Sequence, residues 1–510
     1  MKKYSDLEYL QLSKWRRFLY TLVCLIVGIP GGIWNGIKKI GLWFANAGKR
    51  IAAEFVDIFL TFKNGDWKTR VSFLVMGFGS IARGQVLRGL LFLLMEVVFI
   101  GYMILAGVRW LSQLPELGVL GPVEEYNELL DTFTTVYHDN SFKILLYGVL
   151  TIFFIVGFIV TWRMNIKQNK IAQEILASGK KLRSGKQDLR SLVDDQFHKT
   201  LLALPLMGIF IFTVMPIVFM ILVAFTNYDS MHDGYINNLF DWVGLDTWNT
   251  MLSWGDGNIN YGATLGEILA WTLIWAFFAT FSNYFLGMGV AMMINKKGIR
   301  FKKFWRTCLV MTIAVPQFIS LLYVSKMFAA NGLVNGLLQS NGWIQAALPF
   351  WTDKDWSRVM VILINIWIGI PHMMLMATGI LMNIPADLYE SAKVDGANSW
   401  QQYTKITLPY MLFITGPYLL TSFIGNMNNF NVIFLLTGGG PAKLDAAGVL
   451  GAPGEVDLLI TWLFKMVTTS EPAAYNLASV IGIIVFVVVA GISLVVYNLM
   501  PSIKNEEDFQ

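Results

Sequence analysis

The chain has 510 residues, 55% of them hydrophobic and 14% aromatic, and its mean hydropathy is +0.54. The length alone would fit about three soluble domains, but this composition excludes an ordinary soluble protein and indicates a polytopic membrane protein. The net charge of +5 does not indicate nucleic-acid binding, because the basic residues cluster beside apolar runs, where they fix orientation in a bilayer.

Cysteine and histidine usage narrows the possibilities further. The two cysteines, Cys24 and Cys308, each lie inside an apolar run, so neither a disulfide framework nor a thiolate metal site is expected. The four histidines fall in different segments without the spacing of metal ligands, so no zinc site is expected.

The N-terminal residues 1–87 are basic and aromatic and contain a short apolar run at 18–34, interrupted by Pro30 and two glycines. Lys38 and Lys39 separate this run from a sequence that mimics a signal-peptide cleavage site, so we do not expect cleavage. Positive charge on both flanks also argues against a spanning helix. A re-entrant or surface-lying segment fits better.

Apolar residues recur at helical spacing from residue 33 to 62, and mostly basic residues occupy the other side. A basic amphipathic helix with bulky aromatic residues is suited to the membrane surface, where apolar burial and attraction to anionic lipid add together. A helix packed on the rest of the subunit would show the same pattern, and the sequence does not decide between the two.

Eight apolar runs of spanning length follow, at 88–108, 143–162, 201–226, 266–294, 307–329, 359–381, 410–436 and 476–499. The connecting segments 163–199 and 296–306 are rich in lysine and arginine and should be cytoplasmic. The acidic segments 110–142 and 227–265 should lie outside. An even number of spans then places both termini in the cytoplasm.

The segment 385–409, between the sixth and seventh runs, has the pattern of a helix-turn-helix. Pro385 can open a first helix, and Gly396 supplies a left-handed stop. Ser399, with Gln402 three residues later, predicts the cap of a second short helix that Pro409 would close. A compact fold between two spans, on the predicted inner side, suggests a docking element.

This segment resembles the EAA loop of binding-protein-dependent ABC importer permeases. Glu390, Ser391 and Ala392 stand at the Glu-Ala-Ala positions, and the later positions of the pattern hold Gly396, Ile406, Leu408 and Pro409. Ser391 is the one departure. In that family the loop seats in a groove of the ATPase subunit, which implies docking through Glu390, Ser391, Ala392, Asp395 and Gly396. A solvated turn between helices is the alternative.

Polar residues inside three of the runs are costly in hydrocarbon and tend to face a bundle interior or a water-filled path. They are Gln317 after Pro316, Asn365 and His372 around Gly369, and Asn426, Asn428, Asn429 and Asn431. Amides beside aromatic rings offer the chemistry that sugar hydroxyls and sugar faces need. Kinks at Pro316 and Pro371, and a helix-to-helix hydrogen bond from Gln317, are the structural alternatives.

Residues 200–510, including the sequence LLTGGGP and the spans around it, resemble the maltose/maltodextrin permease family. The resemblance implies a mid-membrane oligosaccharide site at Gln317, Asn365, Gly369, His372, Asn426 and Asn429. Ile313 stands where the family has an aromatic residue, and His372 stands at a tyrosine-like place, so sugar length and linkage stay open. Segment 227–265 is too short for the large extracellular domain of some members.

The resemblance implies an all-α, non-enzymatic permease subunit in the cell membrane, with eight transmembrane helices and a MetI-like core. We divide it into a basic interfacial region at 1–87, two additional helices and a linker at 88–199, and the six-helix core at 200–510. The implied partners are a second permease subunit similar to MalG, two ABC ATPase subunits, a sugar-binding protein, membrane lipid and an oligosaccharide. No cofactor is expected in this chain, because it has no phosphate-binding G-x-x-x-x-G-K-[ST] loop, so ATP and Mg²⁺ would be held by partners.

Two other classes of protein fit the sequence less well. An ion-coupled symporter would need a buried carboxylate, yet the runs at 201–226, 307–329, 359–381 and 410–436 contain no Asp or Glu. A membrane glycosyltransferase would need a carboxylate pair or metal cluster near an interface, where Asp229 and Asp233 are the nearest candidates. Solvation in an outer loop explains those two residues better.

Overall fold

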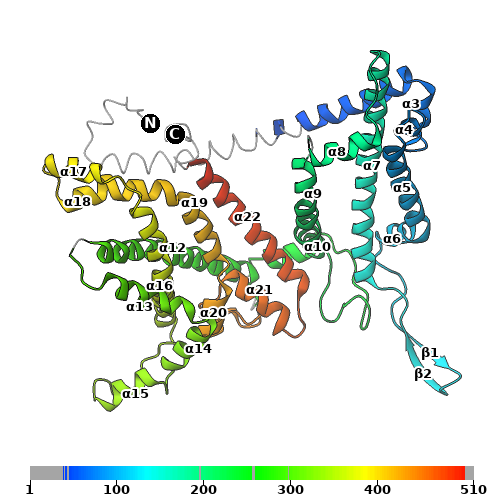
Figure 1. Ribbon diagram of the computed structural model, residues 1–510. Coiled ribbons are helices and arrows are strands. Elements are labelled where there is room, and N and C mark those ends of the chain that lie inside the picture. The colour runs from blue at the N-terminus through cyan, green and yellow to red at the C-terminus, as the bar shows by residue number, and fades with distance from the viewer. Residues whose placement is uncertain are drawn as a thin grey trace. The chain divides into compact units, whose positions relative to one another are not determined.

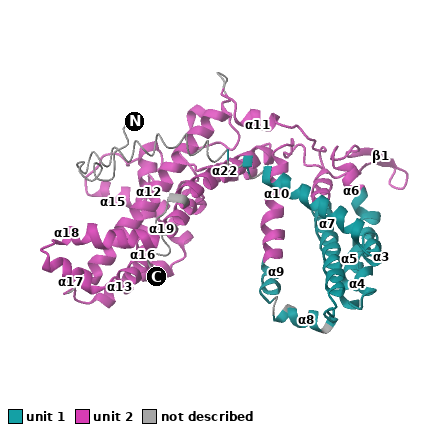
Figure 2. Cartoon of the chain, turned by 90° about the horizontal axis from the view of Figure 1, so that it is seen from above, with its two compact units in different colours: residues 1–108, 150–205 teal, residues 109–149, 206–510 magenta. Residues whose placement is uncertain are grey.

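The structure is a computed structural model that describes residues 38, 41–42, 45–194, 197–254, 259–296 and 298–499. The short apolar run predicted at 18–34 lies outside the described residues. The chain forms two compact units (Figure 2). Unit 1 contains residues 1–108 and 150–205, and unit 2 contains residues 109–149 and 206–510. The threefold division of the sequence stays a prediction.

Unit 1 begins, in its described part, with a helix over residues 45–64, which confirms helical structure for most of the predicted amphipathic segment. The chain continues through α3 (Trp67–Val71) and α4 (Phe78–Ile81) into α5 (Val86–Tyr102) and a π turn η1 (Met103–Gly107). The next helix, α6 (Val108–Gln113), belongs to unit 2 except for Val108. Unit 1 also contains most of α7 (Ser141–Ala177), α8 (Gly185–Val193) and most of α9 (Phe197–Ile209) (Figure 1).

A buried polar cluster holds the segment between α3 and α5 against α7. The Arg83 side chain is 1% exposed, donates to Asp66 Oδ1 at 2.5 Å and to Asn169 Oδ1 at 2.7 Å, and so joins residues 86 positions apart. One turn earlier on α7, Asn165 Oδ1 accepts from the Gly77 amide at 3.0 Å. Because buried polar groups are costly without partners, this mutually satisfied set specifies one packing.

Unit 2 includes a feature that the sequence did not predict. In the acidic segment 110–142, β1 (Val123–Asn127) pairs antiparallel with β2 (Thr132–Val136), with Glu125 opposite Thr134.

The helices of unit 2 that follow the hairpin and α9 are η2 (Phe210–Val214), α10 (Met215–Val223), α11 (Asp246–Met251), α12 (Tyr261–Asn295), α13 (Lys302–Ala314), α14 (Gln317–Met327), α15 (Leu333–Ser340), α16 (Lys354–Leu381), α17 (Ala386–Val394), α18 (Ser399–Gln402), η3 (Tyr403–Thr407), α19 (Leu408–Met427), α20 (Phe430–Thr437), η4 (Leu444–Ala446), α21 (Leu459–Thr468) and α22 (Tyr475–Leu499).

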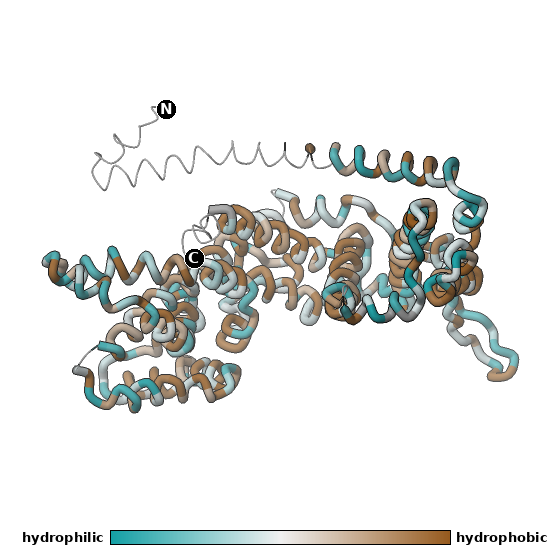
Figure 3. Tube along the Cα trace, turned by 45° about the horizontal axis from the view of Figure 1, so that its top comes forward, coloured by the Kyte–Doolittle hydropathy of each residue, from teal (hydrophilic) through white to brown (hydrophobic). Residues whose placement is uncertain are grey.

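The all-α membrane fold is confirmed. Among the described residues, seven helices are long and apolar enough to cross a membrane, and a bent pair brings the total to eight. Each of the eight predicted runs overlaps one of these spans. Hydrophobic residues dominate the long helices (Figure 3).

The fifth predicted span, 307–329, differs from a single straight helix. It consists of α13 and α14, bent by 90° at Val315 and Pro316. Proline disfavours helical backbone in the residue before it, and Val315 is accordingly extended, with a ψ of 126°. The bend makes Gln317 the first residue of α14.

Segment 385–409, which leads into the seventh predicted span, differs from the predicted helix-turn-helix in two ways. Asn398, not Ser399, forms the capping box, because Asn398 Oδ1 accepts from the Gln401 amide and Gln401 Oε1 accepts from the Asn398 amide, both at 2.8 Å. Pro409 does not close the second helix. The π turn η3 shifts the hydrogen bonds so that the Leu408 amide reaches the Tyr403 carbonyl, and Pro409, without an amide hydrogen, falls in the first turn of α19.

The core of unit 2 is organised around α12, which packs along α16 and α19. Trp275, Tyr284 and Met288 on α12 are fully or almost fully buried. The Tyr284 hydroxyl hydrogen-bonds Thr415 Oγ1 of α19 at 2.9 Å, and the Trp275 indole donates to the Asn426 carbonyl at 2.9 Å. These hydrogen bonds join α12 to α19, and α12, α16, α19 and α14 surround the candidate site.

Candidate functional site

A cavity of about 240 Å³ lies between α12, α14, α16 and α19. The structure brings five of the six predicted substrate residues to its wall, although they come from three helices: Gln317, Asn365, Gly369, His372 and Asn426. The other lining residues are Thr280, Asn283, Tyr284, Ile368, Met373, Tyr418, Leu419 and Ser422. Their role as sugar contacts stays a prediction.

A neighbouring cavity of about 430 Å³ shares Gln317, Ile368 and His372 with the first. Trp367 and Ile313 belong to its wall, so it combines an indole ring with aliphatic surface. Gln317 reaches the boundary of the two cavities because the break at Pro316 places it at the start of α14. His372 reaches the same boundary from α16. Together the cavities offer a polar chamber beside a more apolar one.

Asn283 on α12 lines the cavity with a partly unpaired amide, and it was not among the residues predicted from the sequence. Its Nδ2 donates to the Ala279 carbonyl at 2.9 Å and to the Asn365 carbonyl at 3.4 Å. Its Oδ1 and the Nδ2 of Asn365 are both buried without a hydrogen-bond partner in the described part of the chain. Buried polar atoms of this kind are normally satisfied, so one acceptor and one donor on the wall are left for a ligand or water.

Gly369 makes room for Asn283. A Cβ built on Gly369 would lie 2.4–2.6 Å from the Asn283 amide atoms, which is far closer than side chains approach one another. A glycine at this place on α16 therefore lets the Asn283 amide occupy the wall of the cavity.

The asparagine cluster divides into different roles. Asn426 lines the cavity, and its Nδ2 donates to Thr280 Oγ1 at 3.0 Å. Asn429 caps α20 through its Oδ1, which accepts from the Val432 amide, while its Nδ2 donates to Asn426 Oδ1 at 3.3 Å. Asn428 is exposed and bonds the Ile424 carbonyl of its own helix. Asn429 thus orients Asn426 and is not part of the cavity wall.

A signal for two of the missed residues was present in the sequence. Tyr418, Ser422 and Asn426 follow one another at intervals of four residues on α19, which places them on one face. All three line the cavity. Thr280 and Asn283 on α12 carried no comparable signal, because their span contains many small and polar residues.

The predicted docking segment is well formed and largely exposed. Gly396 has a φ of 75°, as predicted for a left-handed stop, and the Ala397 amide donates to the Ala392 carbonyl at 2.8 Å. The Tyr389 hydroxyl bonds Thr407 Oγ1 at 2.8 Å and ties α17 to the base of the next span. Four of the five predicted docking residues are exposed, namely Glu390, Ser391, Asp395 and Gly396. The fifth, Ala392, is half-buried.

Exposed apolar side chains accompany these polar residues. Val394 is 88% exposed and Trp400 is 69% exposed. The role of this surface in docking an ATPase stays a prediction.

Comparison with known proteins decides the family. Residues 283–504 match the family described as "Binding-protein-dependent transport system inner membrane component". The chain is also 31% identical over 441 residues to the maltodextrin transport system permease protein MdxF of Bacillus subtilis, covering 85% of this chain and 95% of that protein. The chain belongs to this family of transport permeases.

Two other relatives show how much of the chain the similarity covers. The galactooligosaccharides transport system permease protein GanP of Bacillus subtilis is also 31% identical, over 435 residues, covering 85% of this chain and 97% of that protein. The maltose/maltodextrin permease MalF of Escherichia coli is 33% identical over 231 residues, 45% of this chain and 44% of that protein. The resemblance to the maltose/maltodextrin permease family is confirmed, and the chain is a multi-pass subunit of an inner-membrane transporter.

Proposed function

We propose that this permease moves a maltodextrin-type oligosaccharide by alternating access, driven by a separate ATPase docked on segment 385–409. The observation that carries the proposal is the chemistry of the chamber between α12, α14, α16 and α19. Its wall offers amides from Gln317, Asn365 and Asn426, and hydroxyls from Tyr284, Tyr418 and Ser422. Such groups match the hydroxyls of a neutral sugar.

The lining residues also weigh against an ion-coupled symporter. None of the residues around the two cavities is an aspartate, glutamate, lysine or arginine. Carboxylates are common coupling groups in ion-driven transporters, and neither cavity wall contains one. A chamber without carboxylates supports transport of an uncharged solute powered elsewhere.

A galactooligosaccharide is the second candidate substrate. The observation that favours it is the identity of 31% to the galactooligosaccharide permease, which equals the identity to the maltodextrin permease. His372 at a tyrosine-like place and Ile313 at an aromatic place are the differences through which linkage could be selected.

The proposed complex contains a second permease subunit, two ATPase subunits that hold ATP and Mg²⁺, and a sugar-binding protein on the outer side. The proposal assigns no cofactor to this chain. Segment 385–409 would face the cytoplasm, together with both termini, because the basic segments 163–199 and 296–306 lie on the same side of the spans.

Uptake measurements in proteoliposomes that contain the whole complex test the substrate. With ATP inside and binding protein outside, the proposal expects radiolabelled maltotriose to accumulate and a galactotriose to accumulate far more slowly. Preference for the galactose sugar would support the second candidate. Uptake of neither sugar, with an active ATPase, would contradict both.

A further inference from the structure

Helix 45–64 of unit 1 carries an exposed apolar stripe. Ile51, Phe55, Phe59 and Phe62 have exposed fractions of 58%, 68%, 64% and 48%. Their spacing of four, four and three residues places them along one face of the helix. Three large aromatic rings on one face of a helix are too much apolar surface to leave in water.

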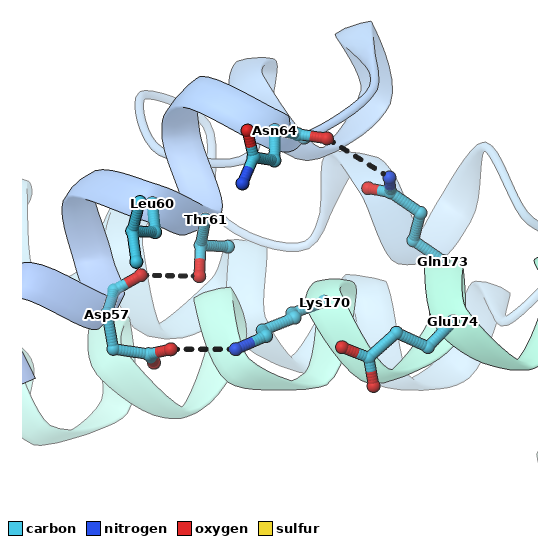
Figure 4. A pocket seen from close by; sticks show the side chains of 8 residues that line it. Asp57, Leu60, Thr61, Asn64, Lys170, Gln173 and Glu174 are labelled. Atoms are coloured by element: carbon cyan, nitrogen blue, oxygen red, sulfur yellow. Dashed lines mark hydrogen bonds and ion pairs between the residues drawn. The ribbon is translucent and has the colours of Figure 1, made fainter.

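The polar side of the same helix is fastened to α7. Arg163 of α7 donates from Nε to Glu54 Oε2 at 2.6 Å and also pairs with Asp57, while Lys170 Nζ lies 2.7 Å from Asp57 Oδ1. Gln173 Nε2 donates to the Asn64 carbonyl at 3.4 Å, one turn further along (Figure 4). These contacts fix the rotation of the helix, so that the aromatic stripe faces away from them.

The pKa of Asp57 indicates that its ion pairs with Arg163 and Lys170 persist at neutral pH. Hydrogen bonds from Lys170 and then Arg163 hold the pKa of this carboxyl below its ordinary value, so it stays ionised at neutral pH. The groups that face it from α7 are both basic, and Glu174 lies further along the same groove.

The same contacts set the depth of the helix relative to α7. Arg163 is the first charged residue after the apolar run 143–162, where α7 leaves the hydrocarbon. Trp162, next to it, donates from its indole to the Phe73 carbonyl at 3.0 Å, and tryptophan favours the membrane interface. The contacts of helix 45–64 with α7 begin at Arg163 and continue through Lys170 to Gln173.

The charged residues of helix 45–64 indicate which kind of surface covers the aromatic stripe. The acidic residues of the helix, Glu54 and Asp57, are occupied by ion pairs with α7. The basic residues Lys49, Arg50 and Lys63 are exposed. A stripe of aromatic residues flanked by exposed positive charge complements an anionic lipid surface, with about 1 kcal/mol of attraction for each basic residue near it.

We propose that helix 45–64 lies in the headgroup layer of the inner leaflet, with its aromatic stripe in the acyl boundary and its basic residues on anionic phospholipid, held there by the contacts to α7. The helix would act as an anchor that sets the height and tilt of unit 1. This inference does not depend on which sugar is carried.

Spin-label accessibility in the full-length chain tests the proposal. Cys24 and Cys308 are replaced by serine, and a label is placed at Phe55→Cys, or at Phe59→Cys if the first variant does not insert. Ala53→Cys is the matched control, because Ala53 is exposed and lies on the far side of the same helix from the stripe. In vesicles of phosphatidylcholine and phosphatidylglycerol, the ratio of oxygen to nickel-chelate collisions should be severalfold higher at residue 55 or 59 than at 53.

Each outcome is decisive. Equal, nickel-accessible labels at both positions would place the stripe in water and overturn the proposal. A stripe label shielded from both reagents would mean that protein covers it, which would overturn lipid as the occupant. In vesicles of phosphatidylcholine alone the ratio at residue 55 should fall, and an unchanged ratio would overturn the role of anionic lipid.

Discussion

At the scale of single residues, the candidate site depends on how α12 and α16 share space. Asn283 can turn its amide toward Asn365 because Gly369 has no side chain, and the two amides leave one acceptor and one donor unpaired on the cavity wall. A sugar hydroxyl can accept and donate at once. This pair is therefore suited to hold a hydroxyl, although only Asn365 belonged to the set predicted from the sequence.

Replacing Gly369 by alanine should displace Asn283 and lower the kcat/KM of sugar uptake about tenfold, the cost of one misplaced hydrogen-bonding pair, about 1.4 kcal/mol. Uptake by the reconstituted complex measures it. Gly379→Ala is the matched control, because it lies on the same helix and an added Cβ there meets nothing within 4 Å. In an Asn283→Ala background the Gly369→Ala change should cost little, and a full additional loss would show that the two residues are not coupled.

Asn429 has an indirect role that can be separated from direct binding. Asn429→Ala removes the bond to Asn426 and the cap of α20, so uptake should weaken by roughly three- to tenfold while basal ATP hydrolysis persists. Asn429→Asp keeps the capping oxygen but loses the donor to Asn426. If Asn429→Asp transports as well as the parent protein, Asn429 acts only as a cap.

At the scale of elements, breaks in helices place the functional groups. The 90° bend at Pro316 brings Gln317 to the chamber, and the break at Asn428 separates α19, which carries Asn426, from α20. The segment 385–409 is joined without interruption to α19 through the π turn at 403–407. A force on α17 therefore has a short, covalent route to a helix that lines the cavity.

Charge reversal tests the docking surface on α17. Glu390→Lys should lower copurification of the ATPase subunits about tenfold, because reversing a charge at an interface costs on the order of 1–2 kcal/mol. The control is Glu124→Lys, which reverses another exposed carboxylate, on the β1 strand. Equal yields of complex from the two variants would remove Glu390 from the interface.

The connection before β1 carries a pH-dependent contact outside the spans. Backbone amides of Val119, at 2.9 Å, and Leu120, at 3.1 Å, donate to Asp139 and hold the pKa of its carboxyl below the ordinary value. A lowered pKa in the folded state stabilises this connection above the ordinary pKa, near 4, and the gain is lost as pH falls through the lowered value.

Hydrogen exchange of the Val119 and Leu120 amides should therefore show protection that decreases on acidification below about pH 4. Asp139→Asn, which cannot ionise, should flatten this dependence. A protection profile that is the same in both proteins would show that the carboxylate does not stabilise the connection.

At the scale of the whole molecule, the spans and the docking segment followed from local patterns, whereas the site needed tertiary structure. Apolar run length located each candidate span in the described part of the chain, and Gly396 located the turn after α17. Asn283 and the Arg83 cluster could not be predicted, because their partners, Asn365 and Asn169, lie 82 and 86 residues away. The bend at Pro316 was visible as a proline, but proline alone does not distinguish a mild kink from a 90° break.

We propose that this chain forms the sugar path and that a docked ATPase drives transport through it. The most direct measurement compares accumulation of radiolabelled maltotriose in proteoliposomes holding the whole complex with that in proteoliposomes holding this chain alone. We predict accumulation only with the complex, internal ATP and external binding protein, and no response to a proton or sodium gradient. Accumulation by the chain alone, or accumulation driven by an ion gradient without ATP, would contradict the claim.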